Sequence, residues 1–300
     1  MGLAQESLKY LVGRVFIFNL YPLSFEEILQ YRDKNLYDLL DKESHPSEEV
    51  NKILKKYYEE FIRYGGYPRV ILASSLEEKE TVLSNIYNTY ILKEIKGILN
   101  IKDEYKLTKL MHALALQIGN IINYHELCTI TSSSYLEIIQ SIQILQKTYV
   151  LAECRPYYQN KRTELVKAPK SFFIDTGFRN AIIKNFQPLS ERPDQGALYE
   201  NSIASELLKN GYEIRYWRTK AKAEVDFVID QNSEIIPIEV KISATHIPKS
   251  LHSFIEKYNP WIGAIISPQA EQQKNTEIIR MIQPWMLPVF LSQTKKNSRK

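Results

Sequence analysis

The stretch Glu224-Val225-Asp226-Phe227-Val228-Ile229-Asp230, followed by Ile235-Ile236-Pro237-Ile238-Glu239-Val240-Lys241, decides the fold of this chain. Both segments alternate large apolar residues with polar ones, which is typical of half-buried strands. Asn232-Ser233 between them predicts a two-residue hairpin turn. Before this hairpin, residues Tyr199 to Leu208 show the apolar spacing of a helix. The sequence therefore predicts a helix and then a β-hairpin that carries carboxylates and one lysine.

The alternation assigns the side chains of this hairpin to faces. On the first strand it places Glu224, Asp226, Val228 and Asp230 on one face and Val225, Phe227 and Ile229 on the other. On the second strand Glu239 and Lys241 share a face, opposite Ile238, Val240 and Ile242. The two-residue turn then pairs Asp226 with Glu239 and Glu224 with Lys241. A different loop length would undo this pairing, and Pro237 indicates an edge strand or a bulge.

Two carboxylates that face each other repel, and a divalent cation between them reverses the sign of that interaction. We therefore expect Glu200, Asp226 and Glu239 to bind Mg²⁺ or Mn²⁺, with the Val240 carbonyl as a further ligand. Glu200 joins this set because its helix places it on the core-facing stripe, where a carboxylate must be paired or bound to a metal. The ion would polarise a phosphoryl oxygen and activate a water, while Lys241 orients that water. The alternative is an exposed hairpin whose charges alternate with apolar residues and form no site.

Composition and charge bound the class of protein. The chain has 300 residues, enough for two or three units, and 44% of them are hydrophobic. A net charge of +4 permits a nucleic-acid partner without indicating one. Cys128 and Cys154 lack metal-type spacing and are expected to be free thiols in a reducing cytoplasm. Because the sequence has neither a long apolar run nor a signal peptide, a soluble cytoplasmic protein without membrane contact is expected.

The first hundred residues are predicted to be mainly helical. Residues 13–20 have the composition of a buried strand that has no partner strand nearby, and Ser24 with Glu27 forms a capping box that starts a helix. Ser47 and Ser75 start two further helices, and Gly65-Gly66 ends the first of these. The sequence predicts a helical connector over residues 26–102.

Residues 103–185 have the pattern of a winged helix-turn-helix unit: three helices, near 106–117, 124–130 and 134–146, and then a hairpin over 149–154 and 170–175. The third helix has no basic residue before Lys147, so sequence-specific reading of DNA is not favoured. A protein-packing role or contact with the phosphate backbone fits better. The expected nucleic-acid contacts are Lys161 and Arg162 at the hairpin tip, and Arg218, Lys220 and Lys222 before the central strand.

Taken together, these segments resemble a known architecture. A helix with Glu200, a strand with Asp226 and a strand with Glu239-Val240-Lys241 are similar to the PD-(D/E)XK nuclease-like superfamily. More closely, the chain resembles the C-terminal two-thirds of prokaryotic AAA-type ATPases that carry a domain of unknown function with this nuclease-like fold. The segments that carry the likeness are residues 13–14, 22–25, 65–68, 173–177, 196–201, 216–220, 224–228 and 238–241. The resemblance implies an α/β nuclease-like domain that follows the helical and winged-helix units.

The ATPase core of that family is missing from this sequence. No Gly-x-x-x-x-Gly-Lys-Ser/Thr motif occurs, and no apolar strand ends in Asp-Glu, so neither Walker motif is present and ATP hydrolysis is not expected. The expected organisation is an ATPase-core remnant at 1–25, the connector at 26–102, the winged-helix unit at 103–185, a nuclease-like domain at 186–294 and a basic tail at 295–300, which is expected to be disordered. The fold class is thus α+β and multidomain.

The sequence leaves two functions open, beside the possibility of an inert remnant that pairs with a separately encoded ATPase. The first is a magnesium-dependent nuclease-like domain of an AAA-ATPase-related protein, acting on or binding DNA or RNA. The alternative is a non-catalytic module for nucleic acid or protein, a winged helix with an inactive nuclease fold. It would work with a separately encoded ATPase or by self-association.

Overall fold

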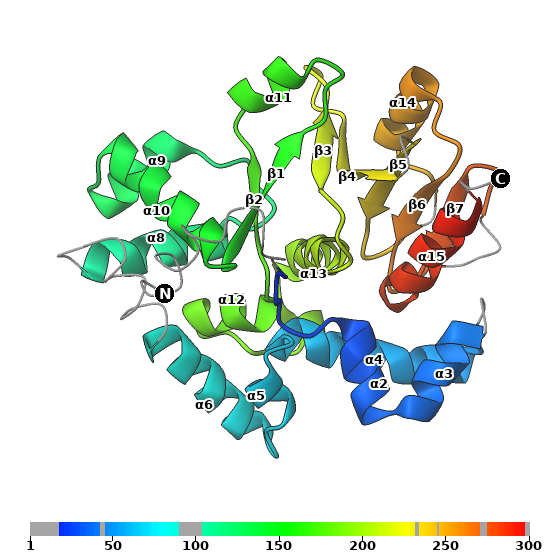
Figure 1. Ribbon diagram of the computed structural model, residues 1–300, viewed down its shortest axis with the longest axis horizontal. Helices are drawn as coiled ribbons and strands as arrows, with labels where there is room; N and C mark the ends of the chain where they lie inside the picture. The colour runs from blue at the N-terminus through cyan, green and yellow to red at the C-terminus, as the bar shows by residue number, and fades with distance from the viewer. Residues whose placement is uncertain are drawn as a thin grey trace, which may run out of the picture.

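A single seven-stranded sheet organises the computed structural model, which describes residues 18–42, 46–89, 104–231, 234–244, 246–270 and 275–297 (Figure 1). The strands are β1 (Leu151–Pro156), β2 (Lys170–Phe173), β3 (Arg215–Arg218), β4 (Glu224–Gln231), β5 (Glu234–Val240), β6 (Gly263–Ile266) and β7 (Ile279–Ile282). Their order is β2-β1-β3-β4-β5-β6-β7. β1 pairs antiparallel with β2 and parallel with β3, β3 to β5 are antiparallel neighbours, and β5 to β7 are parallel. The expected α+β class is confirmed.

Helices surround this sheet. The N-terminal group is α2 (Phe25–Arg32), α3 (Lys34–Lys42), α4 (Glu48–Tyr64), α5 (Pro68–Ile71) and α6 (Leu76–Ile86). The next are α8 (Glu104–Leu116), α9 (Tyr124–Thr131), α10 (Tyr135–Lys147), α11 (Lys161–Val166) and α12 (Thr176–Ile183). The last are α13 (Gln195–Lys209), α14 (Lys249–Tyr258) and α15 (Leu287–Asn297). Figure 1 shows α2 to α6 below the sheet and α8 to α10 at its β2 end.

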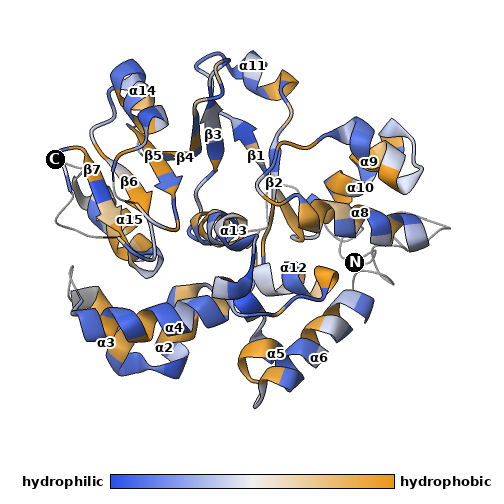
Figure 2. Cartoon of the chain, turned by 180° about the vertical axis from the view of Figure 1, so that it is seen from behind, coloured by the Kyte–Doolittle hydropathy of each residue, from blue (hydrophilic) through white to orange (hydrophobic). Residues whose placement is uncertain are grey.

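Two helices cover opposite faces of the sheet. Leu198 and Ile203 of α13 share the main hydrophobic core with Phe227 of β4. Phe254 of α14 belongs to a second core with Val225. In Figure 2 the β6 strand is coloured mainly as hydrophobic. The sheet is therefore covered by helices on both faces.

The predicted helix starts are confirmed by their caps. The Ser24 Oγ accepts a hydrogen bond from Glu27 N, and the Glu27 carboxylate accepts one from Ser24 N, which completes the capping box of α2. The Ser47 and Ser75 hydroxyls cap α4 and α6 by accepting hydrogen bonds from Val50 N and Glu78 N, without the reciprocal bond of a capping box. Gly65, with φ of 73°, ends α4 in a conformation that a side chain would strain.

The glycine motifs interlock the N-terminal helices with the sheet. Asp175 follows β2 and caps α12, and its Oδ2 accepts a hydrogen bond from Gly66 N at 2.7 Å. A Cβ on Gly177 would fall on the Tyr64 carbonyl, and one on Gly66 would fall on the Leu23 carbonyl. These glycines are required because backbone segments from three parts of the chain touch there.

The strands of the expected wing belong to the central sheet. β1 pairs with β3, which lies beyond the predicted boundary at residue 186. The segment at that boundary is tied down, because Asp194 forms ion pairs with Arg179 at 2.6 Å and with Arg192 at 2.8 Å. The predicted polar tip at residues 158–162 is instead the start of a helix, α11, capped by Asn160. The three helices expected near 106–117, 124–130 and 134–146 are confirmed as α8 to α10.

Other predictions about the ends of the chain are wrong or fall outside the described residues. Residues 18–20 have no regular structure, and residues 13–17 of the predicted strand lie outside the described part. The predicted turn at Asn232-Ser233 and residues 298–300 also lie outside the described part. Residues 295–297, expected to be a disordered tail, continue α15.

Candidate functional site

The β4–β5 hairpin has the predicted register. Phe227 pairs with Ile238, and the pairing continues to Gln231 and Glu234. Extended by one step, this register places Asp226 opposite Glu239. The Asp226 Oδ2 accepts a hydrogen bond from Val240 N at 2.8 Å, so this carboxylate lies at the end of β5.

The predicted alternation along β4 holds from Phe227 to Ile229 but fails at Val225, because a bulge interrupts it. Arg215 of β3 pairs with Val228 whereas Trp217 pairs with Val225, so two steps on β3 match three on β4. Val225 and Val228 therefore lie in one core, while Phe227 lies in the other. Bulges re-aim side chains and are frequent beside functional sites. Here the extra residue falls at Asp226 and Phe227.

Lys241 joins the two carboxylates of the hairpin. Its Nζ lies 2.6 Å from Glu239 Oε1 and 3.9 Å from Asp226 Oδ2. Glu239 is buried, with its side chain 3% exposed, and its other oxygen, Oε2, has no hydrogen-bond partner. A buried carboxylate oxygen without a hydrogen-bond donor costs free energy, so Oε2 is a candidate ligand for a cation or a bound water.

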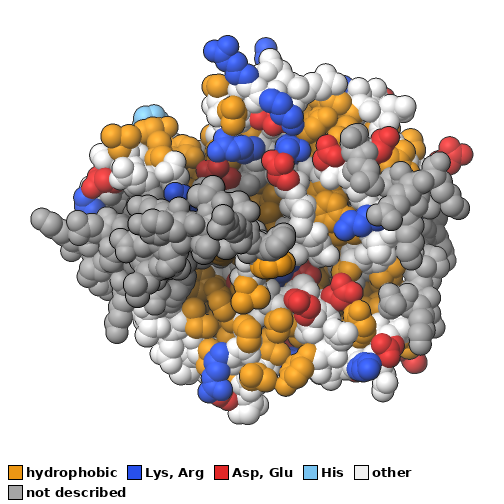
Figure 3. Space-filling view, in the orientation of Figure 1, with side chains coloured by type: hydrophobic (Ala, Val, Ile, Leu, Met, Phe, Trp, Pro, Cys, Tyr) orange, Lys and Arg blue, Asp and Glu red, His pale blue; other side chains and the backbone are white. Residues whose placement is uncertain are grey.

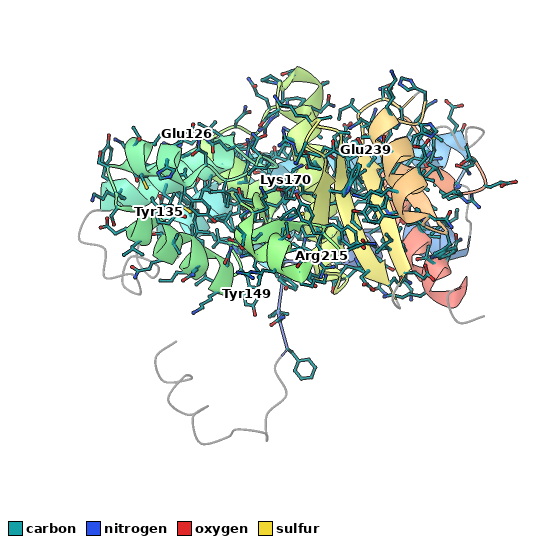
Figure 4. All side chains as sticks on the ribbon, turned by 90° about the horizontal axis from the view of Figure 1, so that it is seen from above. Glu126, Tyr135, Tyr149, Lys170, Arg215 and Glu239 are labelled. Atoms are coloured by element: carbon teal, nitrogen blue, oxygen red, sulfur yellow. The ribbon has the colours of Figure 1, made fainter. Side chains whose placement is uncertain are left out.

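Glu200 of α13 and Glu224 of β4 meet on a second lysine. Lys170, the first residue of β2, places its Nζ 3.0 Å from Glu200 Oε1 and 2.6 Å from Glu224 Oε1. Glu224 also lies 3.5 Å from Arg218 Nε, so its predicted pairing with Lys241 is wrong. Figure 4 shows Lys170 and Glu239 in the interior of the view from above, away from Tyr135 on the outer side of α8 to α10.

Backbone contacts fix Glu200 beside Lys170. The next residue, Asn201, accepts from Phe173 N at 2.8 Å and donates to Phe173 O at 2.7 Å, which ties α13 to β2. A Cβ on Gly119 would lie 3.2 Å from Glu200 Oε2, so the loop between α8 and α9 covers this carboxylate. We call Glu200, Glu224, Asp226 and Glu239, together with Lys170, Lys241 and Arg218, the charged cluster.

Burial changes the acid–base properties of the charged cluster. It raises the pKa of Glu200 to about 8 and that of Glu239 to about 7, and repulsion from Asp226 adds to both shifts. Burial also raises the pKa of Asp226, against the attraction of Lys241 and Lys170. For Lys170 burial opposes the charged form, but the surrounding carboxylates outweigh it and raise its pKa. Burial is thus the largest cause of these shifts, and it favours the protonated forms of Glu200 and Glu239 near neutral pH.

The predicted nucleic-acid contacts lie around this end of the sheet. Lys220 and Lys222 are exposed in the turn between β3 and β4, directly before Glu224. Lys161 and Arg162 are exposed on α11, and the Lys161 ammonium lies 3.2 Å from Glu164. Figure 3 shows Lys and Arg side chains gathered at the end of the molecule where α11 lies, with acidic side chains below them. Arg218 differs from the other four because it takes part in the charged cluster.

The expected metal ligands do not form a ready-made cage. Within the described ranges, no three His, Cys, Asp or Glu side chains meet closely enough to hold a metal ion as they stand. The lysines explain this, since Lys170 forms ion pairs with Glu200 and Glu224, and Lys241 forms one with Glu239.

Every described helix is too short or too polar to span a lipid bilayer.

Comparison with known proteins finds relatives of unknown function. Residues 55–189 match the domain of unknown function DUF8612, and residues 195–287 match the domain of unknown function DUF4143. Lys170 lies in the first match and the four carboxylates lie in the second. The charged cluster therefore forms only where the two matched segments meet.

Two curated relatives cover most of the chain. An uncharacterised protein of Haemophilus influenzae is 28% identical over 259 residues, which are 83% of this chain and 58% of that protein. An uncharacterised protein of Methanocaldococcus jannaschii is 22% identical over 261 residues, 84% of this chain and 56% of that protein. The chain thus spans somewhat more than half the length of these relatives. No solved structure matches it significantly.

Glu200, Asp226, Glu239 and Lys241 are predicted from the sequence to share one site, whereas Lys170 is not. The structure brings Asp226, Glu239 and Lys241 together directly and links Glu200 to Glu224 through Lys170. The available signal was a lysine that opens the run Ser171-Phe172-Phe173-Ile174, whose apolar character predicts burial on both faces. A lysine at the start of such a strand needs a buried partner.

Proposed function

We propose that the charged cluster is the centre of a divalent-cation-dependent phosphodiester hydrolase that acts on nucleic acid. The observation that carries this proposal is Glu239: a buried carboxylate with one oxygen on Lys241 and the other without a donor. Glu239 lies at the strand end where Asp226 is directed toward Val240. A cation bound by these two carboxylates would satisfy the unpaired oxygen and relieve their repulsion.

The donor set suits Mg²⁺ or Mn²⁺. Both ions prefer carboxylate oxygens, a backbone carbonyl and several waters. Asp226 and Glu239 would supply the first ligands, and the Val240 carbonyl would supply another because a strand residue directs its N–H and C=O to the same side. Glu200 would complete the set if its carboxylate turned from Lys170. The ion's chemistry would be to polarise a phosphoryl oxygen and to acidify a bound water.

Lys241 is suited to position the attacking water and to stabilise negative charge, because it is a cation whose side chain is partly exposed. Its side chain is 42% exposed, so its ammonium can leave Glu239 without being drawn out of a buried position. It would then face the attacking water and the negative charge that develops on the phosphoryl oxygens. Water would attack phosphorus and give up a proton, the P–O bond to the leaving oxygen would break, and that oxygen would take up a proton in turn, so that atoms and charge balance.

The exposed basic residues would hold the substrate. Lys220 and Lys222 stand directly before the strand that carries Glu224 and Asp226, so a nucleic-acid backbone bound there would reach the charged cluster. Phosphate contacts of this kind are independent of sequence and position the strand. The absence of basic side chains from α10 before Lys147 agrees with such non-specific binding.

A nuclease assay with a matched pair of variants tests this proposal. Wild-type protein should cut single- or double-stranded DNA, or RNA, in Mg²⁺ or Mn²⁺ and not in EDTA. Asp226→Ala should abolish cutting, whereas Asp230→Ala, which changes an exposed carboxylate of the same strand, should leave it intact. Failure of the wild-type protein to cut any of these substrates, or equal cutting by both variants, would refute the proposal.

A second candidate is a binding module without catalysis, which works with an ATPase as the resemblance to AAA-type proteins implies. It is favoured by the lysines, because Lys170 and Lys241 already pair the four carboxylates. It is also favoured by the exposed side chains of α10, where Tyr135 is 47% and Leu136 70% exposed. Salt-dependent DNA affinity that survives Asp226→Ala, in a protein that never cuts, would establish this function instead.

A further inference from the structure

A cavity of about 300 Å³ opens where β1 and β3 separate. Within the described ranges, the two strands pair only at Arg155 and Pro156 of β1, and Figure 1 shows them closer at the end near α11 than at the other end. Gln146 of α10, residues of β1 and the segment directly before β3 line this β1–β3 cavity. None of its lining residues belongs to the charged cluster, so the proposed hydrolysis gives the cavity no role.

The backbone of β1 leaves hydrogen-bonding groups unpaired along the β1–β3 cavity. Ile174 N donates to Val150 O, so the even-numbered residues of β1 are the ones that exchange hydrogen bonds with β2. The N–H and C=O groups of Leu151 and Glu153 therefore point away from β2, toward the side of β3. Arg155 points the same way and pairs with β3, but the described part of β3 does not extend to Leu151 and Glu153. Their backbone groups thus form an open strand edge beside the cavity.

A buried side-chain donor belongs to the same cavity. Gln146 lines it, and the Nε2 of this residue is buried without an acceptor among the described residues. A buried N–H without an acceptor costs free energy, and the soft terminal torsion of a glutamine lets its amide turn to a ligand. The nearby charges are already paired, since Glu153 lies 2.7 Å from Arg155 and the neighbouring Glu213 forms its own ion pair at 2.6 Å. The cavity therefore suits a ligand with hydrogen-bonding groups and little charge.

We propose that the β1–β3 cavity binds a short extended peptide segment of another protein, which pairs with β1 as an added strand. Leu151 and Glu153 present the same pair of backbone groups about 7 Å apart, a repeat that an extended peptide matches. Addition of a strand to an open edge is a recurring mode of peptide recognition, in which backbone hydrogen bonds provide the affinity. The peptide carbonyls accept from the N–H groups of Leu151 and Glu153 and from Gln146 Nε2. This proposal does not rest on the proposed hydrolysis.

Selection from a displayed library of linear heptapeptides, with the 300-residue protein as bait, tests the proposal. Enriched peptides, synthesised singly, should bind Gln146→Leu about fivefold or more weakly than wild type. The matched control is Gln143→Leu, which changes an exposed residue of the same helix and should bind as wild type does. Because Gln146→Leu removes a buried donor that has no partner, it should keep the fold, which thermal unfolding checks.

Two further measurements identify the bound form as a strand. N-methylation of the peptide, one amide at a time, should weaken binding by about tenfold or more at alternate positions, because only every second N–H of an added strand faces β1. In the protein, followed by NMR, the peptide should slow hydrogen exchange of the Leu151 and Glu153 amides and change that of Ala152, which is bonded to β2, much less.

Several outcomes would overturn the proposal. Selection that enriches no peptide would do so, as would equal binding to wild type and Gln146→Leu. Peptides that bind without the alternating effect of N-methylation would be compact ligands and not added strands. Single-stranded DNA that alters exchange of the Leu151 and Glu153 amides, where no peptide does, would assign the cavity to nucleic acid instead.

Discussion

Replacing Asp175 by alanine should destabilise the protein, because it removes a hydrogen bond that joins α4 to the segment after β2. Asp175 is buried, and its two oxygens serve different parts of the fold. Oδ1 accepts from Phe178 N at 2.8 Å and caps α12, while Oδ2 accepts from Gly66 N at 2.7 Å at the end of α4. The Asp175 side chain thus caps α12 and also joins the C-terminal end of α4 to the segment after β2.

The size of the effect follows from these two bonds. Loss of an N-cap costs about 1 kcal/mol. Leaving the buried N–H of Gly66 without its carboxylate acceptor costs about 1–3 kcal/mol more. Burial raises the pKa of Asp175, so this carboxyl is itself costly to bury and its removal recovers part of the loss. The free energy of unfolding should therefore fall by about 1–3 kcal/mol, which lowers Tm by roughly 2–10 °C.

Urea unfolding followed by circular dichroism measures this difference. The matched control is Ser134→Ala, which removes the exposed cap of α10 and should cost only about 1 kcal/mol. The difference between the two variants is the contribution of the bond to Gly66. Equal destabilisation by Asp175→Ala and Ser134→Ala would refute the claim that this bond ties α4 to the sheet.

Three further predictions concern other parts of the molecule. Burial opposes ionisation of Asp194, but its bonds to two arginines outweigh it and lower its pKa to about 2. Because the pKa of Asp194 is lower in the folded than in the unfolded protein, its contribution to the free energy of unfolding is complete above about pH 4 and is lost as pH falls toward 2. For a side chain that is 26% exposed, this contribution amounts to about 1–2 kcal/mol. Asp194→Asn should therefore make the free energy of unfolding less dependent on pH in the acid range. Gly177→Ala should destabilise by about 3 kcal/mol or more in urea unfolding because its Cβ meets backbone, whereas Gly196→Ala, with open space around its Cβ, should be neutral or stabilise α13. Replacing Lys220 and Lys222 by Gln should weaken DNA binding and reduce the slope of log affinity against log salt by about one for each phosphate that the protein no longer neutralises.

Each of these has a contradicting outcome. An unchanged acid limb in Asp194→Asn would exclude that carboxylate as its source. Equal stability of the two alanine variants would show that the close approach at Gly177 is relaxed in solution. For DNA binding the control is Lys52→Gln, on an exposed face of α4, where the side chain is 72% exposed. An equal loss of affinity in this control would mean that the turn between β3 and β4 has no particular role.

Local patterns in the sequence were sufficient for much of the fold. Ser24 and Glu27 predict the start of α2 because both halves of a capping box are local. The register of β4 and β5 was predictable because the loop length and the alternation leave few choices. The bulge at Val225 to Val228 was not, because it depends on how β3 pairs with β4, and β3 is too short to have a pattern of its own.

The site was predictable only in part for the same reason. Asp226, Glu239 and Lys241 lie close together in sequence and were identified from their spacing. Lys170 comes from a strand at the edge of the sheet, two strands from β3, and reaches Glu200 and Glu224 only through tertiary folding. The apolar run after Lys170 indicates that this lysine is buried, but no local signal relates it to Glu200 or Glu224.

The measurement that tests the central claim most directly is anomalous scattering from Mn²⁺ in crystals of the protein grown with Mn²⁺ and a short DNA strand. We expect one strong peak about 2.1 Å from carboxylate oxygens of Asp226 and Glu239, with Lys241 turned away from Glu239 and Lys170 unmoved. Crystals of Asp226→Ala should have no such peak. A wild-type structure with no peak at these carboxylates, and with Lys241 still on Glu239, would contradict the proposed cation site.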